Sequence, residues 1–103
     1  MTEFADVLNI ENTANTPKLV FIEPWIEELT VPAGSILKII GESSIAGTFE
    51  YDRDTGTVWG WPGSNVTAFI GDRAIWASEM ECPGLPNGVT LRSFTGTMGW
   101  QDT

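Results

Sequence analysis

The sequence predicts a small all-β domain, an antiparallel sandwich or barrel of about seven to nine short strands with little or no helix. Turn-forming residues, mainly Gly, Pro, Asn, Asp and Ser, recur at short spacing along the chain. Between them lie short runs rich in Val, Ile, Thr, Phe and Trp, and several of these alternate with the period of two that a strand requires. A chain of 103 residues is one domain by the usual length prior, so we expect a single domain over 1–103.

The expected strands follow one another in chain order and are separated by turns. They cover residues 5–12, 18–25, 28–32, 35–41, 47–52, 57–61, 65–70, 74–77 and 89–95. Between two of them, Gly71 and Asp72 are expected to form a two-residue hairpin turn with glycine first. We expect a short helical turn near Ala77–Glu81, where helix-forming residues gather.

Alternation along two of these strands predicts which side chains enter the core. Leu29 and Val31 lie two apart, so they share one face of their strand. In the run SILKII, Lys38 must face solvent, which turns Leu37 and Ile39 toward the core.

The stretch FIEPWIEELTVPAG contains glutamates beside a tryptophan and therefore raises the question of a site. The strand before it, 18–25, is apolar on both faces, which is typical of a central strand. Pro24 lacks an N–H, so pairing must stop or bulge there, and Trp25 is expected to pack against the core after the bend. Glu27 and Glu28 then mark a strand edge, where charge discourages pairing with another sheet.

Glu23 is the acidic residue of this stretch that most needs an explanation. It ends the most apolar strand, and a carboxylate in such surroundings requires a partner. Arg73, Arg92 or backbone N–H groups near the bend are the candidate partners. We therefore expect a structural clamp with a shifted pKa rather than a catalytic group.

The charge of the chain excludes several classes of partner. Fourteen acidic and 5 basic residues give a net charge of −9, and the basic residues are scattered. Binding to nucleic acid or to an anionic membrane surface requires clustered Lys and Arg, so neither partner is expected. Such acidity suits a basic protein partner, or keeps the protein dissolved and apart from its copies.

Missing residue types limit the chemistry of the chain. It has no histidine, which excludes Ser-His-Asp and Cys-His catalysis and every zinc site that needs histidine. No cofactor is expected. Cys82 is the single cysteine, so no intrachain disulfide forms, and the neighbouring carboxylates disfavour its thiolate. A lone thiol fits a reducing compartment, and the acidic N-terminus lacks the features of a secretory signal, so we expect a cytoplasmic location.

The tryptophans of TVWGWPGSN form one candidate binding site. Trp59 and Trp61 lie two apart and share one face of a regular strand, where they could stack on a sugar or on a partner. The alternative is a core position, because tryptophan is highly buried on average. On a regular strand Val58 faces the side opposite the two tryptophans. Either the tryptophan pair lies in the core and Val58 faces solvent, or Val58 lies in the core and the pair faces solvent. Gly60 indicates that another group packs closely on that face.

Asp52 and Asp54, in the run DRDTG, are weak candidates for a metal site. The run resembles the start of a calcium loop, but its glycine comes one place early and no glutamate stands at the twelfth position. A hairpin turn between Tyr51 and Val58 is the favoured interpretation, since Asp and Gly suit turns.

The leading functional hypothesis is a small non-enzymatic binding domain for a protein partner, which could be a basic protein or a second copy of the chain. Trp59, Trp61, Trp25 and Glu23 are the candidate contact residues. A carbohydrate-binding sandwich that uses Trp59 and Trp61 is the second hypothesis, a hydrolase that uses carboxylates alone is the third, and an acidic mimic of nucleic acid is the fourth.

Overall fold

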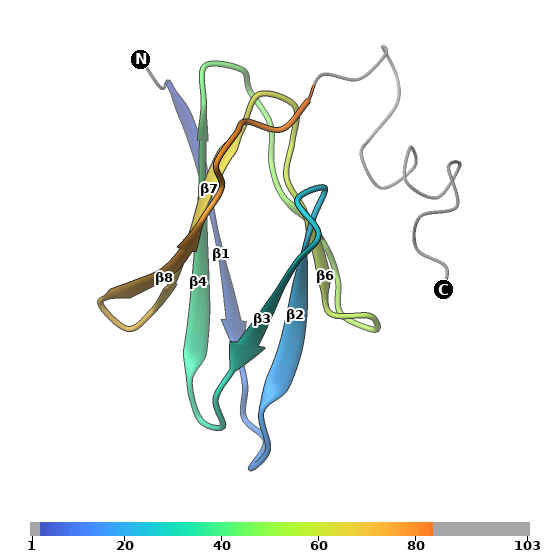
Figure 1. Cartoon of the computed structure of the whole chain (residues 1–103), viewed down its shortest axis with the longest axis vertical. Coiled ribbons are helices and arrows are strands. Elements are labelled where there is room, and N and C mark those ends of the chain that lie inside the picture. The colour runs from blue at the N-terminus through green and yellow to red at the C-terminus, as the bar shows by residue number, and fades with distance from the viewer. Residues whose placement is uncertain (1–2, 84–103) are drawn as a thin grey trace.

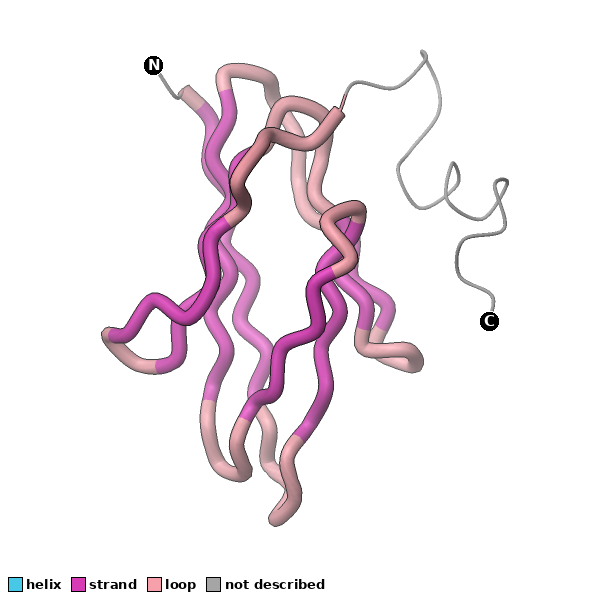
Figure 2. Tube along the Cα trace, in the orientation of Figure 1, coloured by secondary structure: helices cyan, strands magenta, loops and turns pink. Residues whose placement is uncertain are grey.

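Residues 3–83 are described by a computed structural model, and every regular element among them is a strand (Figures 1 and 2). The eight strands are β1 (Phe4–Glu11), β2 (Lys18–Glu23), β3 (Glu27–Val31), β4 (Ile36–Ser43), β5 (Glu50–Asp52), β6 (Thr57–Trp59), β7 (Asn65–Ile70) and β8 (Arg73–Ala77). The all-β prediction is confirmed.

The strands form two four-stranded sheets, which makes the fold a sandwich rather than a barrel. One sheet has the order β1-β4-β7-β8 and the other β3-β2-β6-β5, so β2 is central and β3 is an edge, as predicted. Every pair is antiparallel except β2 with β6, which is parallel. The second sheet is therefore mixed rather than purely antiparallel, because β2 and β6 are distant in sequence and no hairpin dictates their direction.

The core lies between the two sheets and is almost wholly aliphatic. Its members alternate along each strand with residues that face outward, as the period of two requires. Leu37, Ile39 and Val31 are fully buried and Leu29 nearly so, which confirms the predicted core faces. The buried cluster consists of Ile10, Val20, Ile22, Leu29, Val31, Leu37, Ile39, Val58, Val66 and Ala68.

The connections fall into two sets, according to which ends of the strands they join (Figure 1). We call one the β2–β3 end; it holds the β2–β3 turn (24–26), the β4–β5 connection (44–49), the β6–β7 connection (60–64) and the segment 78–83. The opposite end holds the β1–β2, β3–β4, β5–β6 and β7–β8 turns, where the two-residue Gly71–Asp72 turn is found as predicted.

Asn12 joins the two sheets at the opposite end. Its side-chain amide donates to the carbonyls of Val31 (3.0 Å) and Thr16 (2.9 Å), and its oxygen accepts from the Ala14 N–H (3.1 Å). The β1–β2 and β3–β4 connections both cross from one sheet to the other. By bonding to both connections, the buried Asn12 amide fixes the position of one sheet relative to the other.

Some predicted elements differ from the structure at their ends. No helical turn forms at Ala77–Glu81, because Ser78 and Cys82 continue beside the strand β7, where their N–H groups bond to the carbonyls of Val66 and Ser64. The expected strands 18–25, 47–52 and 57–61 are shorter, since pairing stops at Glu23 and covers three residues each in β5 and β6. The expected strand 89–95 lies outside the described residues.

Candidate functional site

The β2–β3 turn has the most unusual backbone of the described chain. The strand β2 ends at Glu23, a cis peptide bond joins Glu23 to Pro24, and β3 begins at Glu27. Ile26 closes the turn at φ 57°, in the left-handed region that glycine and asparagine occupy most readily. Its β-branched side chain is 76% exposed. The turn therefore presents an aliphatic group to solvent from a conformation that is costly for isoleucine.

Trp25 anchors this turn to the rest of the molecule. Its indole N–H donates to the carbonyl of Met80 (2.9 Å), and its ring meets Trp76 of β8 edge-on, with centroids 5.8 Å apart and planes at 67°. The ring also packs against the core, as the sequence predicted. Trp25 thus holds a turn of one sheet against the chain that follows the edge strand of the other.

The segment around Met80 completes the β2–β3 end. Met80 is 69% exposed, so two apolar side chains, Ile26 and Met80, stand on the two chain segments that the Trp25 hydrogen bond joins. Cys82, only 2% exposed, packs with Trp25 and Trp59 on the inner side of the same segment. Burial raises the pKa of the Cys82 thiol to about 12, which favours the protonated thiol over the thiolate at neutral pH.

Trp59 and Trp61 are both buried, at 7% and 4% exposure, and present no exposed platform for stacking. Val58 is buried as well. The prediction that either Val58 or the tryptophan pair, but not both, would be buried is therefore wrong. The strand β6 ends at Trp59, and strict alternation does not extend to Trp61. Two groups pack against Gly60, as the sequence predicted one would: the Trp25 ring and the Ser64 hydroxyl would each lie 2.9 Å from a Cβ at that position.

Trp61 lies apart from the other candidate residues. Its ring meets Phe49 edge-on at 5.3 Å, and its indole N–H donates to the carbonyl of Ile45 (2.9 Å). The ring covers the backbone at Gly41 and Gly47, where a Cβ would overlap it. Trp61 therefore fills the space between β4 and the β4–β5 connection.

Glu23 lies beside Trp59, its register partner in the parallel pair, on the outward face that it shares with Phe21. Burial raises the pKa of the Glu23 carboxyl above its ordinary value of 4.5. The expected partner Arg73 begins β8 beside the β7–β8 turn, at the other end of the sandwich (Figure 1). Arg92 lies outside the described residues. Glu27 is paired with Ile22, whose side chain faces inward, so Glu23 and Glu27 point to opposite faces of the sheet.

Asp52 and Asp54 lie in the β5–β6 hairpin, which is the turn that the sequence favoured. The Asp52 carboxylate accepts a hydrogen bond from the Asp54 N–H (2.9 Å), and Gly56 closes the turn at φ 69°. Among residues 3–83 no group of three or more Asp, Glu or Cys side chains is placed to hold a metal ion.

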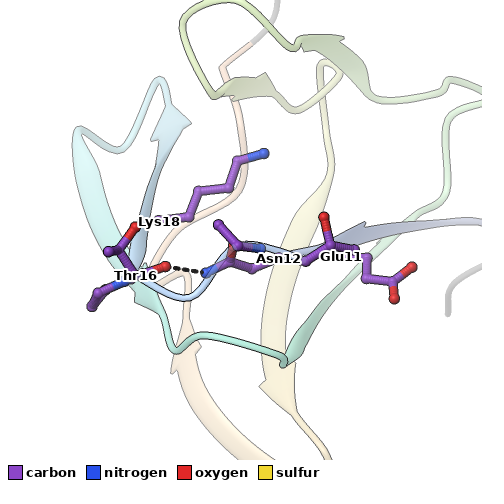
Figure 3. Close-up of a pocket in the computed structure, with 7 residues that line it drawn as sticks. Glu11, Asn12, Thr16 and Lys18 are labelled. Carbon is purple, nitrogen blue, oxygen red and sulfur yellow. Dashed lines mark hydrogen bonds between the residues drawn. The ribbon is translucent and has the colours of Figure 1, made fainter.

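A surface hollow of about 350 Å³ lies at the opposite end, along the β1–β2 turn (Figure 3). The polar atoms of Asn12 at its floor are already engaged with the backbone, and Glu11 and Lys18 at its rim point in different directions (Figure 3). Because the Asn12 amide is engaged and the two charged side chains at the rim diverge, we assign the hollow no function.

Charge divides the described molecule into two unlike ends. Eight glutamates belong to the β2–β3 end or to strand residues next to it, and Asp6 lies in the same part of β1. The glutamates are Glu3, Glu23, Glu27, Glu28, Glu42, Glu50, Glu79 and Glu81. No Lys or Arg of residues 3–83 is found there. The described cations Lys18, Lys38, Arg53 and Arg73 lie at or near the opposite end, together with Glu11, Asp52, Asp54 and Asp72. The opposite end is therefore close to neutral, and the net negative charge is concentrated at the β2–β3 end and in its adjoining strands.

The structure brings together three of the four predicted contact residues, Glu23, Trp25 and Trp59, and leaves Trp61 apart. It adds Ile26 and Met80, which sequence reasoning missed. The sequence gives no signal for Ile26, because type I and type VI turns reverse a chain without any left-handed residue. No signal marks Met80 either, since its position depends on the Trp25 hydrogen bond.

Comparisons with family models, with curated proteins and with solved structures found no match to this chain. Function must therefore be argued from the geometry and charge of the site itself. None of the described residues forms a helix that could cross a membrane.

Proposed function

We propose that this chain is a small acidic, non-enzymatic domain that binds a basic protein partner through its β2–β3 end. The observation that carries the proposal is the separation of charge, which places eight glutamates and no described cation in that end and in the strand residues next to it. A surface of one sign attracts a partner of opposite sign, speeds the encounter and orients it. The buried, protonated Cys82 is compatible with a reducing cytoplasm as the site of action.

A matched pair of triple variants tests this function. Glu27→Gln with Glu79→Gln and Glu81→Gln neutralises the β2–β3 end. Glu11→Gln with Asp54→Asn and Asp72→Asn removes the same charge from the opposite end. Each variant and the wild-type protein are immobilised, incubated with cell lysate at low salt, and the retained proteins are identified.

The proposal expects a specific basic protein to be retained by the wild-type protein and by the opposite-end variant, and lost from the β2–β3-end variant. Retention by both variants alike contradicts a role for this end. Retention of nonspecific background alone contradicts the binding function.

A further inference from the structure

The acidic end also carries exposed apolar side chains, and these narrow the chemistry of the partner. Ile26 and Met80 are 76% and 69% exposed, and they stand on the two segments that the Trp25–Met80 hydrogen bond joins. Glu27 follows Ile26 directly, and Glu79 and Glu81 flank Met80. Apolar groups are therefore interleaved with carboxylates along both segments.

Several contacts hold the backbone that carries this pair. Trp25 packs against the core, meets Trp76 and bonds to the Met80 carbonyl, so the turn and the segment 78–82 are fixed to both sheets. Cys82 adds a second attachment, because its N–H donates to the Ser64 carbonyl (2.9 Å). The backbone that carries Ile26 and Met80 is therefore held in place before a partner arrives, and it loses little conformational freedom on binding.

We infer that Ile26 and Met80 form an apolar anchor for a cationic amphipathic segment of the partner, whose Lys or Arg side chains pair with the surrounding glutamates. This inference rests on the proposed function and names the partner's chemistry. A second copy of the chain is a poor occupant, since it would bring two sets of like charges together. An anionic lipid surface is a poor occupant for the same reason.

Two synthetic peptides of equal charge serve as probes. One has Lys and Leu spaced to form an amphipathic helix, and the other keeps every Lys and replaces each Leu by Ser. Binding to the ¹⁵N-labelled full chain is followed by NMR at low salt, which gives both the dissociation constant and the backbone amides that respond. The Lys/Leu peptide should bind about tenfold more tightly, because it buries apolar surface that the Lys/Ser peptide cannot. The responding amides should lie in 25–28 and 78–82.

Ile26→Asn and Met80→Gln should each remove most of this tenfold preference. Asparagine suits the left-handed backbone at position 26, so the fold is retained. Ile36→Asn is the matched control: Ile36 is 49% exposed at the start of β4, near the opposite end, and its replacement should leave the preference intact.

Equal binding of both peptides through the glutamates would overturn the anchor while leaving charge recognition in place. A response centred on another surface, such as the outward face of β4, would also overturn it. Failure of both peptides to bind would contradict the anchor and the charge recognition on which it rests.

Discussion

The backbone conformation of Ile26 lowers the stability of the folded protein. A left-handed conformation costs an L-residue about 1–2 kcal/mol, and Ile26, at φ 57° and 76% exposed, gains little packing in return. Ile26→Asn should therefore raise the free energy of unfolding by about 1 kcal/mol, measured by urea denaturation. Ile36→Asn, on a regular strand, should give no such gain. A loss of stability in Ile26→Asn would show that the isoleucine side chain contributes more than its exposure indicates.

Glu23 should make stability depend on pH in a defined direction. Burial raises the pKa of its carboxyl above 4.5, so the folded protein binds this proton more tightly than the unfolded chain does. The Glu23 contribution to the free energy of unfolding therefore falls as the pH rises from 4.5 through the raised folded value. Glu23→Gln removes this loss and should be more stable than the wild-type protein at pH 7, with a smaller difference at pH 4.

Urea denaturation at the two pH values measures this difference. Glu28→Gln is the control, because Glu28 is an exposed carboxylate on the neighbouring strand and its replacement changes the net charge equally. If Glu28→Gln gains as much as Glu23→Gln, reduced net charge rather than the burial of Glu23 explains the effect.

At the scale of the elements, the glycines of β4 and of the connection after it depend on Trp61. A Cβ at Gly47 would overlap the indole ring, whose position is set by its contact with Phe49 and by its hydrogen bond to the Ile45 carbonyl. Gly47→Ala should lower the free energy of unfolding by about 1–3 kcal/mol, as overpacking of a filled core does, and thermal denaturation measures the loss. Gly71→Asn is the comparison, since that left-handed glycine has open space around it and should tolerate asparagine. Unchanged stability in Gly47→Ala would mean that Trp61 can move aside.

The elements also show what a sequence pattern can predict. Period-two alternation identified the inward faces around Leu37 and Leu29. Each of these strands has one face toward the core and one toward solvent, so the apolar side chains can only occupy the first. The same rule failed in β6, where Trp59 faces away from the core residue Val58 and is nevertheless buried, packed with Cys82 and Trp25. Trp61 lies beyond the end of that strand, and its ring turns toward β4. The rule also could not foresee that β2 lies parallel to β6, because pairing between distant segments is decided by the whole fold.

The candidate site was less predictable than the fold for a related reason. Glu23 and Trp25 attracted attention through their residue types, since a carboxylate among apolar residues and a tryptophan after proline both require explanation. Ile26 and Met80 are ordinary residues, and their importance comes from where Trp25 fixes the two segments. Counting charged residues gave the net charge of the chain. The concentration of negative charge at the β2–β3 end becomes visible only when the structure shows at which end each turn lies.

At the scale of the whole molecule, this concentration of charge should oppose folding. Like charges held together repel one another in the compact state, and dissolved salt screens that repulsion. The melting temperature of the wild-type protein should therefore rise between low and moderate sodium chloride. Neutralising Glu27, Glu79 and Glu81 should raise stability at low salt by about 0.5 kcal/mol and flatten the dependence on salt.

The opposite-end variant, in which Glu11, Asp54 and Asp72 are neutralised, separates the position of the charge from its amount. Those acids share their end with the described cations, so removing them also removes attraction, and no gain at low salt is expected. Thermal denaturation of both variants across the salt range compares them directly. If the two variants gained equally, net charge alone would govern stability and the separation of charge would have no energetic effect. A gain confined to the β2–β3-end variant would mean that the proposed binding surface carries a repulsion that a basic partner relieves.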